Sequence, residues 1–244
     1  MRRLLLLSSS KEGNSGYLET AKRPIEEFLA AHQVSANDEV LFVPFAGVNI
    51  NYDDYFDLVT AALADIPVRL TALHRASDPA AAIKKSKAIL VGGGNTFHLL
   101  HQLYQFDFFG LIREAVLAGK PYIGWSAGSN IASPSIKTTN DMPIVQPPSF
   151  HALQLIPFQI NPHYLDQHPK GFNGETREQR LQEFMQVNPD AVVVGLPEGT
   201  ALKVIDNRVE ILGEQPVMLF RNQQKEVAST EALNHLLELD EAMP

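Results

Sequence analysis

Residues Tyr122–Gly128 read Tyr-Ile-Gly-Trp-Ser-Ala-Gly, an apolar strand end that runs directly into a Gly-x-Ser-x-Gly pattern. This pattern is typical of a nucleophile elbow, a tight turn that pushes a serine hydroxyl out of a sheet toward substrate. The nucleophile at such a turn has a strained backbone, so Gly124 and Gly128 have a steric reason to flank it. We therefore predict that Ser126 is a nucleophile. The alternative is a structural strand-to-helix turn, which also needs small residues.

A second glycine cluster, Gly92–Gly94, follows the apolar run Ile89–Val91 and opens a predicted helix. It lacks the Lys-Ser/Thr of a P-loop and the Gly-x-Gly-x-x-Gly spacing of a dinucleotide-binding turn. Backbone N–H groups in a loop without side chains can closely approach a reacting carbonyl, as an oxyanion hole requires. The N–H of Ala127, directly after the serine, is the natural second donor. A tight turn that uses glycine for its positive φ is the alternative.

A serine hydroxyl needs an adjacent base, usually a histidine that a carboxylate orients. Among the eight histidines, His163 stands out because it follows the apolar run Gln159–Pro162 in a loop fixed by proline. Loops at strand ends carry many active-site residues, so we predict that His163 is the general base. His74, which ends a predicted strand, is a second candidate. The others fit surface, packing or solvated loop positions: His32, His98, His101, His151, His168 and His235.

Two loops could supply the acid that orients the histidine. One is Thr139–Pro143, which contains Asp141, and the other is Gly195–Gly199, which contains Glu198. Either acid could instead be a turn former or a helix cap. Spacing alone does not choose between them, so both are predicted site residues.

Composition limits the kind of protein that surrounds these residues. The chain has 244 residues, of which 45% are hydrophobic, enough for one large α/β domain or two small ones. Its formal charge of -8 and its lack of a lysine or arginine run argue against a nucleic-acid partner. Because the chain has no cysteine, disulfides, thiolate metal sites and a cysteine nucleophile are excluded together. A reducing cytoplasm is compatible with this composition.

The sequence contains no apolar run that approaches the ~18 residues of a membrane span, so we expect no membrane partner. Its start, Met1–Leu7, superficially suggests a secretory signal, but the apolar run is short and polar residues follow at once. A first buried strand is the better interpretation, and we expect a cytoplasmic protein.

Short apolar runs alternate with amphipathic segments, which predicts an α/β fold with a mostly parallel central sheet flanked by helices. Continuous apolar runs are typical of strands buried on both faces. They span residues 3–8, 39–44, 68–72, 88–91, 121–125 and 191–195. Apolar residues at helical spacing predict helices over 17–31, 53–64, 78–85, 109–118 and 176–187.

The C-terminal part has a different character. Two short strands, 201–205 and 208–212, flank Asp206-Asn207, which predicts a C-terminal β-hairpin region. A strand over 216–221 and a last helix from about Thr230 follow. We find no repeat, low-complexity tract or linker, so we predict one domain over residues 1–244.

Seven motifs stand in order along almost the whole chain: Val43–Gly47, Val91–Phe97, Gly124–Gly128, Thr138–Val145, Ile160–His163, Gly174–Arg180 and Gly195–Gly199. Together they resemble serine peptidase family S51, which includes α-aspartyl dipeptidases. The resemblance implies a sheet flanked by helices, related to class I glutamine amidotransferases, with serine where those enzymes carry cysteine. Ser129 is a small departure, because alanine is expected there in the family.

The resemblance also implies roles for individual residues. It implies that Ser126 is the nucleophile, that His163 is the general base and that Asp141 or Glu198 is the orienting acid. It further implies that Gly93 or Gly94, together with Ala127, supplies the oxyanion donors. Arg177 is implied as the guanidinium that binds the β-carboxylate of an N-terminal aspartate. From the sequence alone, Arg177 is equally a solvated helix residue with Glu175 or Glu178 as ion-pair neighbour.

The implied reaction is hydrolysis of dipeptides with an N-terminal aspartate through an acyl-enzyme on Ser126, with no metal or cofactor. The implied partner is a small peptide substrate. Two alternatives stay open: an S51-related hydrolase of another aspartyl amide, similar to cyanophycinase, and a non-catalytic binding protein on the same fold.

Overall fold

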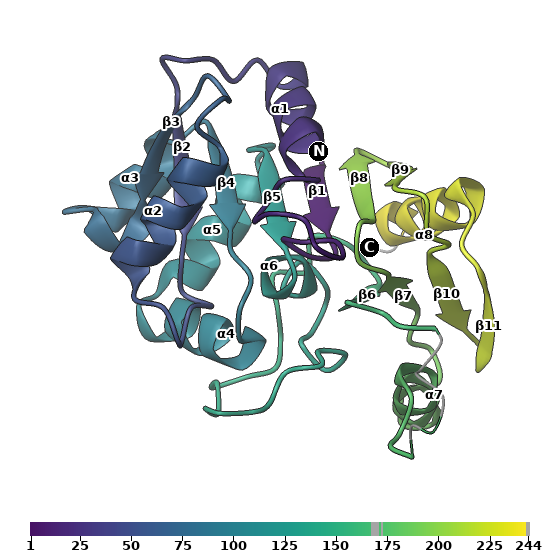
Figure 1. The fold of residues 1–244 in the computed structure, drawn as a ribbon. Helices are drawn as coiled ribbons and strands as arrows, with labels where there is room; N and C mark the ends of the chain where they lie inside the picture. Colours follow the sequence, from purple (N-terminus) through teal and green to yellow (C-terminus); the bar gives the residue numbers. More distant parts are fainter. Residues whose placement is uncertain (167–170, 172, 243–244) are drawn as a thin grey trace.

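A computed structural model of the chain describes residues 1–166, 171 and 173–242, so the histidine candidate His168 lies outside the described residues. A large sheet with helices on its faces forms one part of the molecule, and a smaller sheet with two helices forms the other (Figure 1). No helix of the described residues is long and apolar enough to cross a membrane.

The large sheet has seven strands in the described part of the chain, in the order β3-β2-β4-β5-β1-β8-β9. Their bounds are β1 (Arg3–Leu7), β2 (Glu39–Val43), β3 (Arg69–Ala72), β4 (Ala88–Val91), β5 (Tyr122–Trp125), β8 (Ala201–Ile205) and β9 (Arg208–Leu212). Strands β3, β2, β4, β5 and β1 pair in parallel, whereas β8 is antiparallel to β1 and to β9. This arrangement confirms the predicted mostly parallel sheet. It also brings the carboxyl ends of β4, β5 and β1 to one edge.

Alternate side chains of each central strand enter two different cores, which explains the continuous apolar runs. Leu4 and Leu6 of β1 belong to one hydrophobic cluster, and Leu5 and Leu7 belong to another. Helices α1 (Lys22–Ala31) and α2 (Tyr52–Ala62) contribute to the second cluster. The first cluster takes residues from α3 (Pro79–Lys85), α4 (Thr96–Gln105), α5 (Phe108–Leu117) and α6 (Ala127–Asn130). A single 3₁₀ turn, η1 (Leu73–Arg75), follows β3.

The helix predicted over 17–31 begins only at Lys22. Leu18 has a positive φ of 55°, which a helix does not allow, and its N–H donates to the carbonyl of Ser10. The prediction was therefore wrong for residues 17–21, although their apolar side chains have helical spacing.

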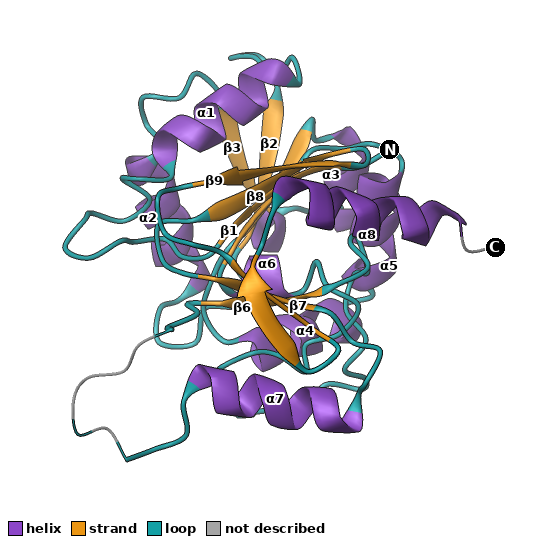
Figure 2. Cartoon of the chain, turned by 90° about the vertical axis from the view of Figure 1, so that its right-hand side faces the viewer, coloured by secondary structure: helices purple, strands orange, loops and turns teal. Residues whose placement is uncertain are grey.

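The smaller sheet has the order β11-β10-β7-β6. It consists of β6 (Gln159–Pro162), β7 (Val193–Leu196), β10 (Met218–Arg221) and β11 (Gln224–Val227), with α7 (Arg177–Val187) and α8 (Thr230–Ala242) beside it (Figure 2). The predicted hairpin is confirmed, since β8 and β9 pair around Asp206, whose φ is 50°. Strand β11 was not predicted, because its residues are mostly polar and exposed.

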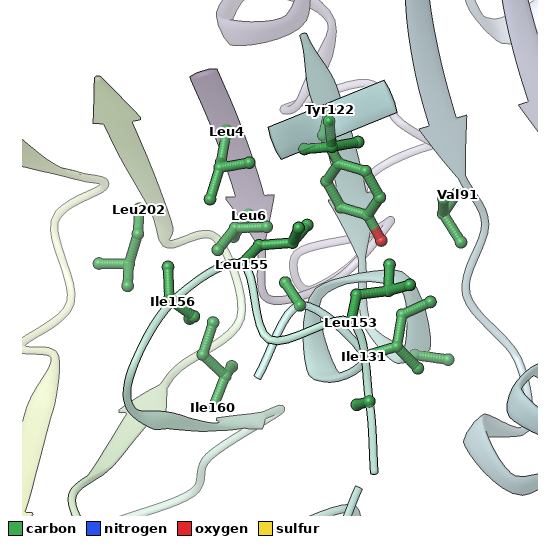
Figure 3. Close-up of a cluster of buried hydrophobic side chains, with 14 of the residues drawn as sticks. Leu4, Leu6, Val91, Tyr122, Ile131, Leu153, Leu155, Ile156, Ile160 and Leu202 are labelled. Atoms are coloured by element: carbon green, nitrogen blue, oxygen red, sulfur yellow. The ribbon is translucent and has the colours of Figure 1, made fainter. Parts of the chain in front are cut away.

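The two sheets share one core. Leu4 and Leu6 of β1 lie beside Leu155, Ile160 of β6 and Leu202 of β8 in this cluster (Figure 3). The single domain over residues 1–244 stays a prediction, which this common core supports.

Candidate active site

Ser126 lies at the end of β5 and has φ 54° and ψ -114°, a backbone conformation that residues other than glycine rarely adopt. A Cβ on Gly128 would collide with the carbonyl of Val91 at the end of β4, and a Cβ on Gly124 would collide with the backbone of Gly128. Only glycine fits at either position, so the Gly-x-Ser-x-Gly pattern has the steric cause that the sequence predicts. The turn leads at once into the short helix α6.

His163 follows β6 directly and has a positive φ of 53°. Its Nε2 lies 2.9 Å from Oγ of Ser126. The N–H of His163 donates to Oγ of Ser8 at 2.9 Å, and that hydroxyl donates to the carbonyl of Leu196 at 2.7 Å. Ser8 therefore ties the ends of β6 and β7 to the end of β1. The proline before the histidine lies within the strand rather than in the predicted loop.

Glu198 lies just beyond β7, the parallel neighbour of β6, so its loop is adjacent to that of His163. Oε1 of Glu198 lies 2.8 Å from Nδ1 of His163. The two side chains are 51% and 39% exposed, respectively, so solvent reaches this pair. Of the two predicted acids, Glu198 is the one in contact with the histidine.

Asp141 has other partners. Its carboxylate accepts from the N–H of Thr96 at 2.7 Å and from the hydroxyl of Thr139 at 3.0 Å. Since Thr96 is the first residue of α4, Asp141 satisfies one of the free N–H groups at that helix start. Among the described residues, no hydrogen bond joins Asp141 to His163. The structure therefore brings both acids to the site in different positions.

The glycine loop lies directly beside the serine. A Cβ on Gly93 would be 3.0 Å from Cβ of Ser126, and a Cβ on Gly94, whose φ is 138°, would collide with the carbonyl of Ala46. Within the described part of the chain, the N–H groups of Gly93, Gly94 and Ala127 have no acceptor. Free N–H donors next to a serine can stabilise a developing oxyanion.

A cavity of about 690 Å³ opens beside these groups, within the range of small-molecule sites. Its lining includes Ser126, His163, Gly93, Gly94, Asn95 and the aromatic side chains Tyr17, Tyr55 and Trp125. Asp141 is the single carboxylate among the described residues that line it. The cavity therefore offers a peptide one negative charge close to the serine.

Arg177 is the first residue of α7, after a capping box formed by Thr176 and Gln179. Burial, followed by the positive charge of Arg180, lowers the pKa of Arg177, while the Asp141 carboxylate acts in the opposite direction. Arg177 is not among the described residues that line the cavity. Its charge nevertheless interacts with that of Asp141, which lines the cavity.

Ser8 and Tyr55 also belong to the site, although they are part of no sequence motif. Ser8 is the first polar residue after the apolar run of β1, at the sheet edge that carries the site. This position could have been noticed from the sequence. Tyr55 lies inside an amphipathic helix, where an aromatic residue is ordinarily explained by packing alone.

Serine, histidine and glutamate side chains in a hydrogen-bonded row, beside free N–H groups at the carboxyl edge of a parallel sheet, have the geometry of a serine hydrolase. The comparisons with known proteins identify the family. Peptidase family S51 matches residues 4–212. The chain belongs to this family and is a peptidase, which confirms the resemblance found in the sequence.

Curated relatives cover nearly the whole chain. A protein named peptidase E from Shewanella oneidensis is 49% identical over 235 residues, which are 96% of this chain and 98% of the relative. Peptidase E from Shewanella baltica is also 49% identical over 235 residues, with 96% and 97% covered.

Solved structures agree on the fold. A candidate peptidase E protein from Listeria monocytogenes is similar with a TM-score of 0.66 and 25% identity, covering 88% of this chain and 100% of that one. A peptidase from an acI-B1 Actinobacterium has a TM-score of 0.63 at 17% identity, over 93% and 95% of the two chains.

Proposed function

We propose that this peptidase hydrolyses dipeptides with an N-terminal aspartate through an acyl-enzyme on Ser126. The hydrogen-bonded row from Ser126 through His163 to Glu198, with distances of 2.9 and 2.8 Å, is the observation that supports the chemistry best. The substrate class is supported by the relatives named peptidase E, by Asp141 in the cavity lining, and by the charge interaction of Arg177 with Asp141.

In the proposed mechanism, Oγ of Ser126 attacks the scissile carbonyl while Nε2 of His163 takes its proton. Glu198 holds the imidazole in the tautomer that leaves Nε2 free to accept, and it stabilises the imidazolium that forms. The N–H of Ala127 and those of Gly93 or Gly94 bind the oxyanion. His163 then protonates the departing amine, and water repeats the cycle on the aspartyl ester.

Two charged residues account for recognition of an N-terminal aspartate. The guanidinium of Arg177 binds the β-carboxylate, because its planar fork can make two parallel hydrogen bonds. Asp141 binds the α-ammonium group, since it is the one carboxylate among the described cavity-lining residues and keeps an oxygen beside the serine. A free α-amine is attached one carbon from the scissile carbonyl, so its receptor must lie close to Ser126.

The test is release of free aspartate from Asp-Leu, compared with Glu-Leu, Ala-Leu and acetyl-Asp-Leu. We expect rapid cleavage of Asp-Leu alone, loss of cleavage in Ser126→Ala, and a large loss of kcat/KM in Arg177→Gln. Cleavage of Asp-Leu that survives Ser126→Ala contradicts the nucleophile assignment. Efficient cleavage of acetyl-Asp-Leu contradicts recognition of the amine.

A β-linked aspartyl dipeptide, added to these substrates, tests the alternative function, hydrolysis of another aspartyl amide. Preference for this substrate over Asp-Leu would assign the protein to hydrolysis of another aspartyl amide. Absence of Ser126-dependent cleavage on every substrate would favour the non-catalytic binding protein.

We also propose a cytoplasmic location and a single folded domain. The cysteine-free composition supports the location, and the core shared by both sheets supports the domain count. Cell fractionation tests the first proposal. One cooperative unfolding transition, seen alike by tryptophan fluorescence and far-UV circular dichroism, is the expected result for the second.

A further inference from the structure

A chain of hydrogen bonds runs from the elbow strand to the glycine loop through three aromatic side chains. Nε1 of Trp125 donates to the hydroxyl of Tyr17 at 3.0 Å, and that hydroxyl donates to the hydroxyl of Tyr55 at 3.1 Å. The hydroxyl of Tyr55 then donates to the carbonyl of Gly93 at 2.9 Å. The chain thus begins at the residue before Ser126 and ends on a proposed oxyanion peptide.

The hydroxyl of Tyr55 stays protonated and therefore acts as a hydrogen-bond donor toward Gly93. The side chain projects from α2 into the core, where Tyr55 is 4% exposed and packs edge to face against Phe42. Burial raises the pKa of Tyr55 to about 12 and also raises the pKa of Tyr17. Both hydroxyls therefore keep their protons throughout the range in which a histidine base works.

The carbonyl of Gly93 and the N–H of Gly94 belong to the same trans peptide, so they point in opposite directions. A bond that fixes the carbonyl also fixes the direction of the N–H. Gly94, with φ 138°, has the freedom of glycine, and a peptide between two glycines rotates at low cost unless something holds it. Tyr55 holds this peptide by its carbonyl and leaves the N–H without a protein acceptor.

Close contact strengthens the coupling between Tyr55 and the loop. A Cβ on Gly92 would lie 2.5 Å from the hydroxyl oxygen of Tyr55, so the loop backbone rests directly on that oxygen. The N–H of Gly92 donates to Val43 at the end of β2, and the N–H of Asn95 donates to Ala46. These bonds hold the two ends of the loop. The bond from Tyr55 is the hydrogen bond that holds its middle.

We propose that Tyr55 is a positioning residue that orients the Gly93–Gly94 peptide so that the N–H of Gly94 points at the oxyanion. This inference rests on the proposed function and assigns the donor role within the glycine loop to Gly94. Tyr17 and Trp125 act through Tyr55, because they hold its hydroxyl in the direction of Gly93. Charge builds up on the oxygen only in the transition state, so the orientation affects kcat rather than substrate binding.

The test removes only the hydroxyl, with Tyr55→Phe. We expect kcat for Asp-Leu to fall about tenfold or more, less than the 10²–10³-fold typical of deleting a donor outright, since the N–H is misdirected and not removed. KM should stay within about twofold, and the pH dependence of kcat/KM should keep its position because His163 is untouched. Tyr17→Phe leaves the bond from Tyr55 to Gly93 in place, so its kcat should fall less.

Tyr52→Phe is the matched control. Tyr52 is on the same helix and packs against Phe45, but its hydroxyl makes no hydrogen bond within the described residues. Its kcat should equal that of the wild type. The loss of kcat should therefore be absent in Tyr52→Phe, intermediate in Tyr17→Phe and largest in Tyr55→Phe.

An unchanged kcat in Tyr55→Phe, or a raised KM at unchanged kcat, overturns the proposal. If Tyr55→Phe does not fold, a kcat in Tyr17→Phe equal to that of Tyr52→Phe overturns it instead. Ser126→Ala in the same assay separates the two levels. Serine-dependent cleavage without an effect of Tyr55 refutes this inference and leaves the proposed function standing, whereas serine-independent cleavage refutes the proposed function.

Discussion

Nδ1 of His163 and Oε1 of Glu198 lie 2.8 Å apart, although 35 positions separate the two residues in the sequence. The parallel pairing of β6 with β7 creates this contact, because it brings the loops that follow both strands side by side. An Nδ1–H that donates to the carboxylate leaves Nε2 as an acceptor that faces Ser126. Asp141, by contrast, is bonded to the start of α4.

Glu198→Gln and Asp141→Asn should therefore differ in their effect on the serine itself. The rate of labelling of Ser126 by a small fluorophosphonate reports nucleophile activation without aspartate recognition. We expect Glu198→Gln to slow labelling by up to about 10⁴-fold, the loss seen when the histidine adopts the wrong tautomer. Asp141→Asn should label within about tenfold of the wild-type rate. The reverse order would make Asp141 the orienting acid.

Gly128→Ala should destabilise the protein, because the added methyl group collides with the carbonyl of Val91. Overpacking against backbone cannot relax by a rotamer change, so we expect a loss of at least about 2 kcal/mol in the free energy of unfolding. Urea denaturation measures it. Gly110→Ala is the control, since a Cβ there meets nothing within 4 Å inside α5 and should stabilise by about 0.5–1 kcal/mol. Equal stability of the two variants would contradict the steric account.

Ser8→Ala and Ser129→Ala remove two serine hydroxyls that both bond to backbone near the elbow. Ser8 joins the N–H of His163 to the carbonyl of Leu196, while Ser129 donates to the carbonyls of Leu7 and Gly124. Each loss should cost about 1 kcal/mol of stability. Only Ser8→Ala should also lower kcat, by about tenfold, because it frees the loop that carries the base. Equal kcat in the two variants would show that Ser8 does not position His163.

Much of this fold follows from local patterns in the sequence. The runs 88–91 and 121–125 are predicted as strands because they are continuously apolar, and β4 and β5, in which every residue is buried, are found there. The hairpin of β8 and β9 was predicted from Asp206-Asn207. Such features depend on residues close together in the chain.

The rest depends on contacts between distant segments. Choosing between Asp141 and Glu198 requires knowing which strand is the neighbour of β6. Strand β11 has no apolar pattern because it lies at a sheet edge, and it forms by pairing with β10. The part played by Tyr55 depends on the position of a carbonyl 38 residues away.

The ammonium group of Lys225 on β11 joins the segment after His163 to the start of α7. It lies 2.6 Å from Oδ1 of Asp166 and 2.5 Å from Oε2 of Glu178, and the hydroxyl of Tyr164 also donates to Asp166. Glu178 is the neighbour of Arg177 in the sequence. The two ion pairs of Lys225 therefore hold the segment after His163 and the start of α7, which carries Arg177, the proposed receptor of the β-carboxylate, against β11.

Lys225→Met should raise KM for Asp-Leu by up to about fivefold at nearly unchanged kcat, which corresponds to at most the ~1 kcal/mol of a partly exposed ion pair. Lys203→Met is the control, because Lys203 pairs with Glu210 across β8 and β9 and should leave KM unchanged. A change in kcat alone, or equal KM values in the two variants, would contradict this role of Lys225.

The ion pair between Lys225 and Asp166 predicts how the segment after His163 responds to acid. Lys225 lowers the pKa of Asp166 below its ordinary value. A carboxylate with a lowered pKa stabilises the fold above its unfolded-state pKa of about 3.9, and this contribution is lost as the pH falls through the lowered value. Amide hydrogen exchange of Tyr164, whose N–H donates to the carbonyl of Leu196, should thus be faster in Lys225→Met than in the wild type at neutral pH. Below about pH 4 the difference in opening free energy should shrink, and a difference that persists there would show that Lys225 acts on this segment by contacts other than the ion pair with Asp166.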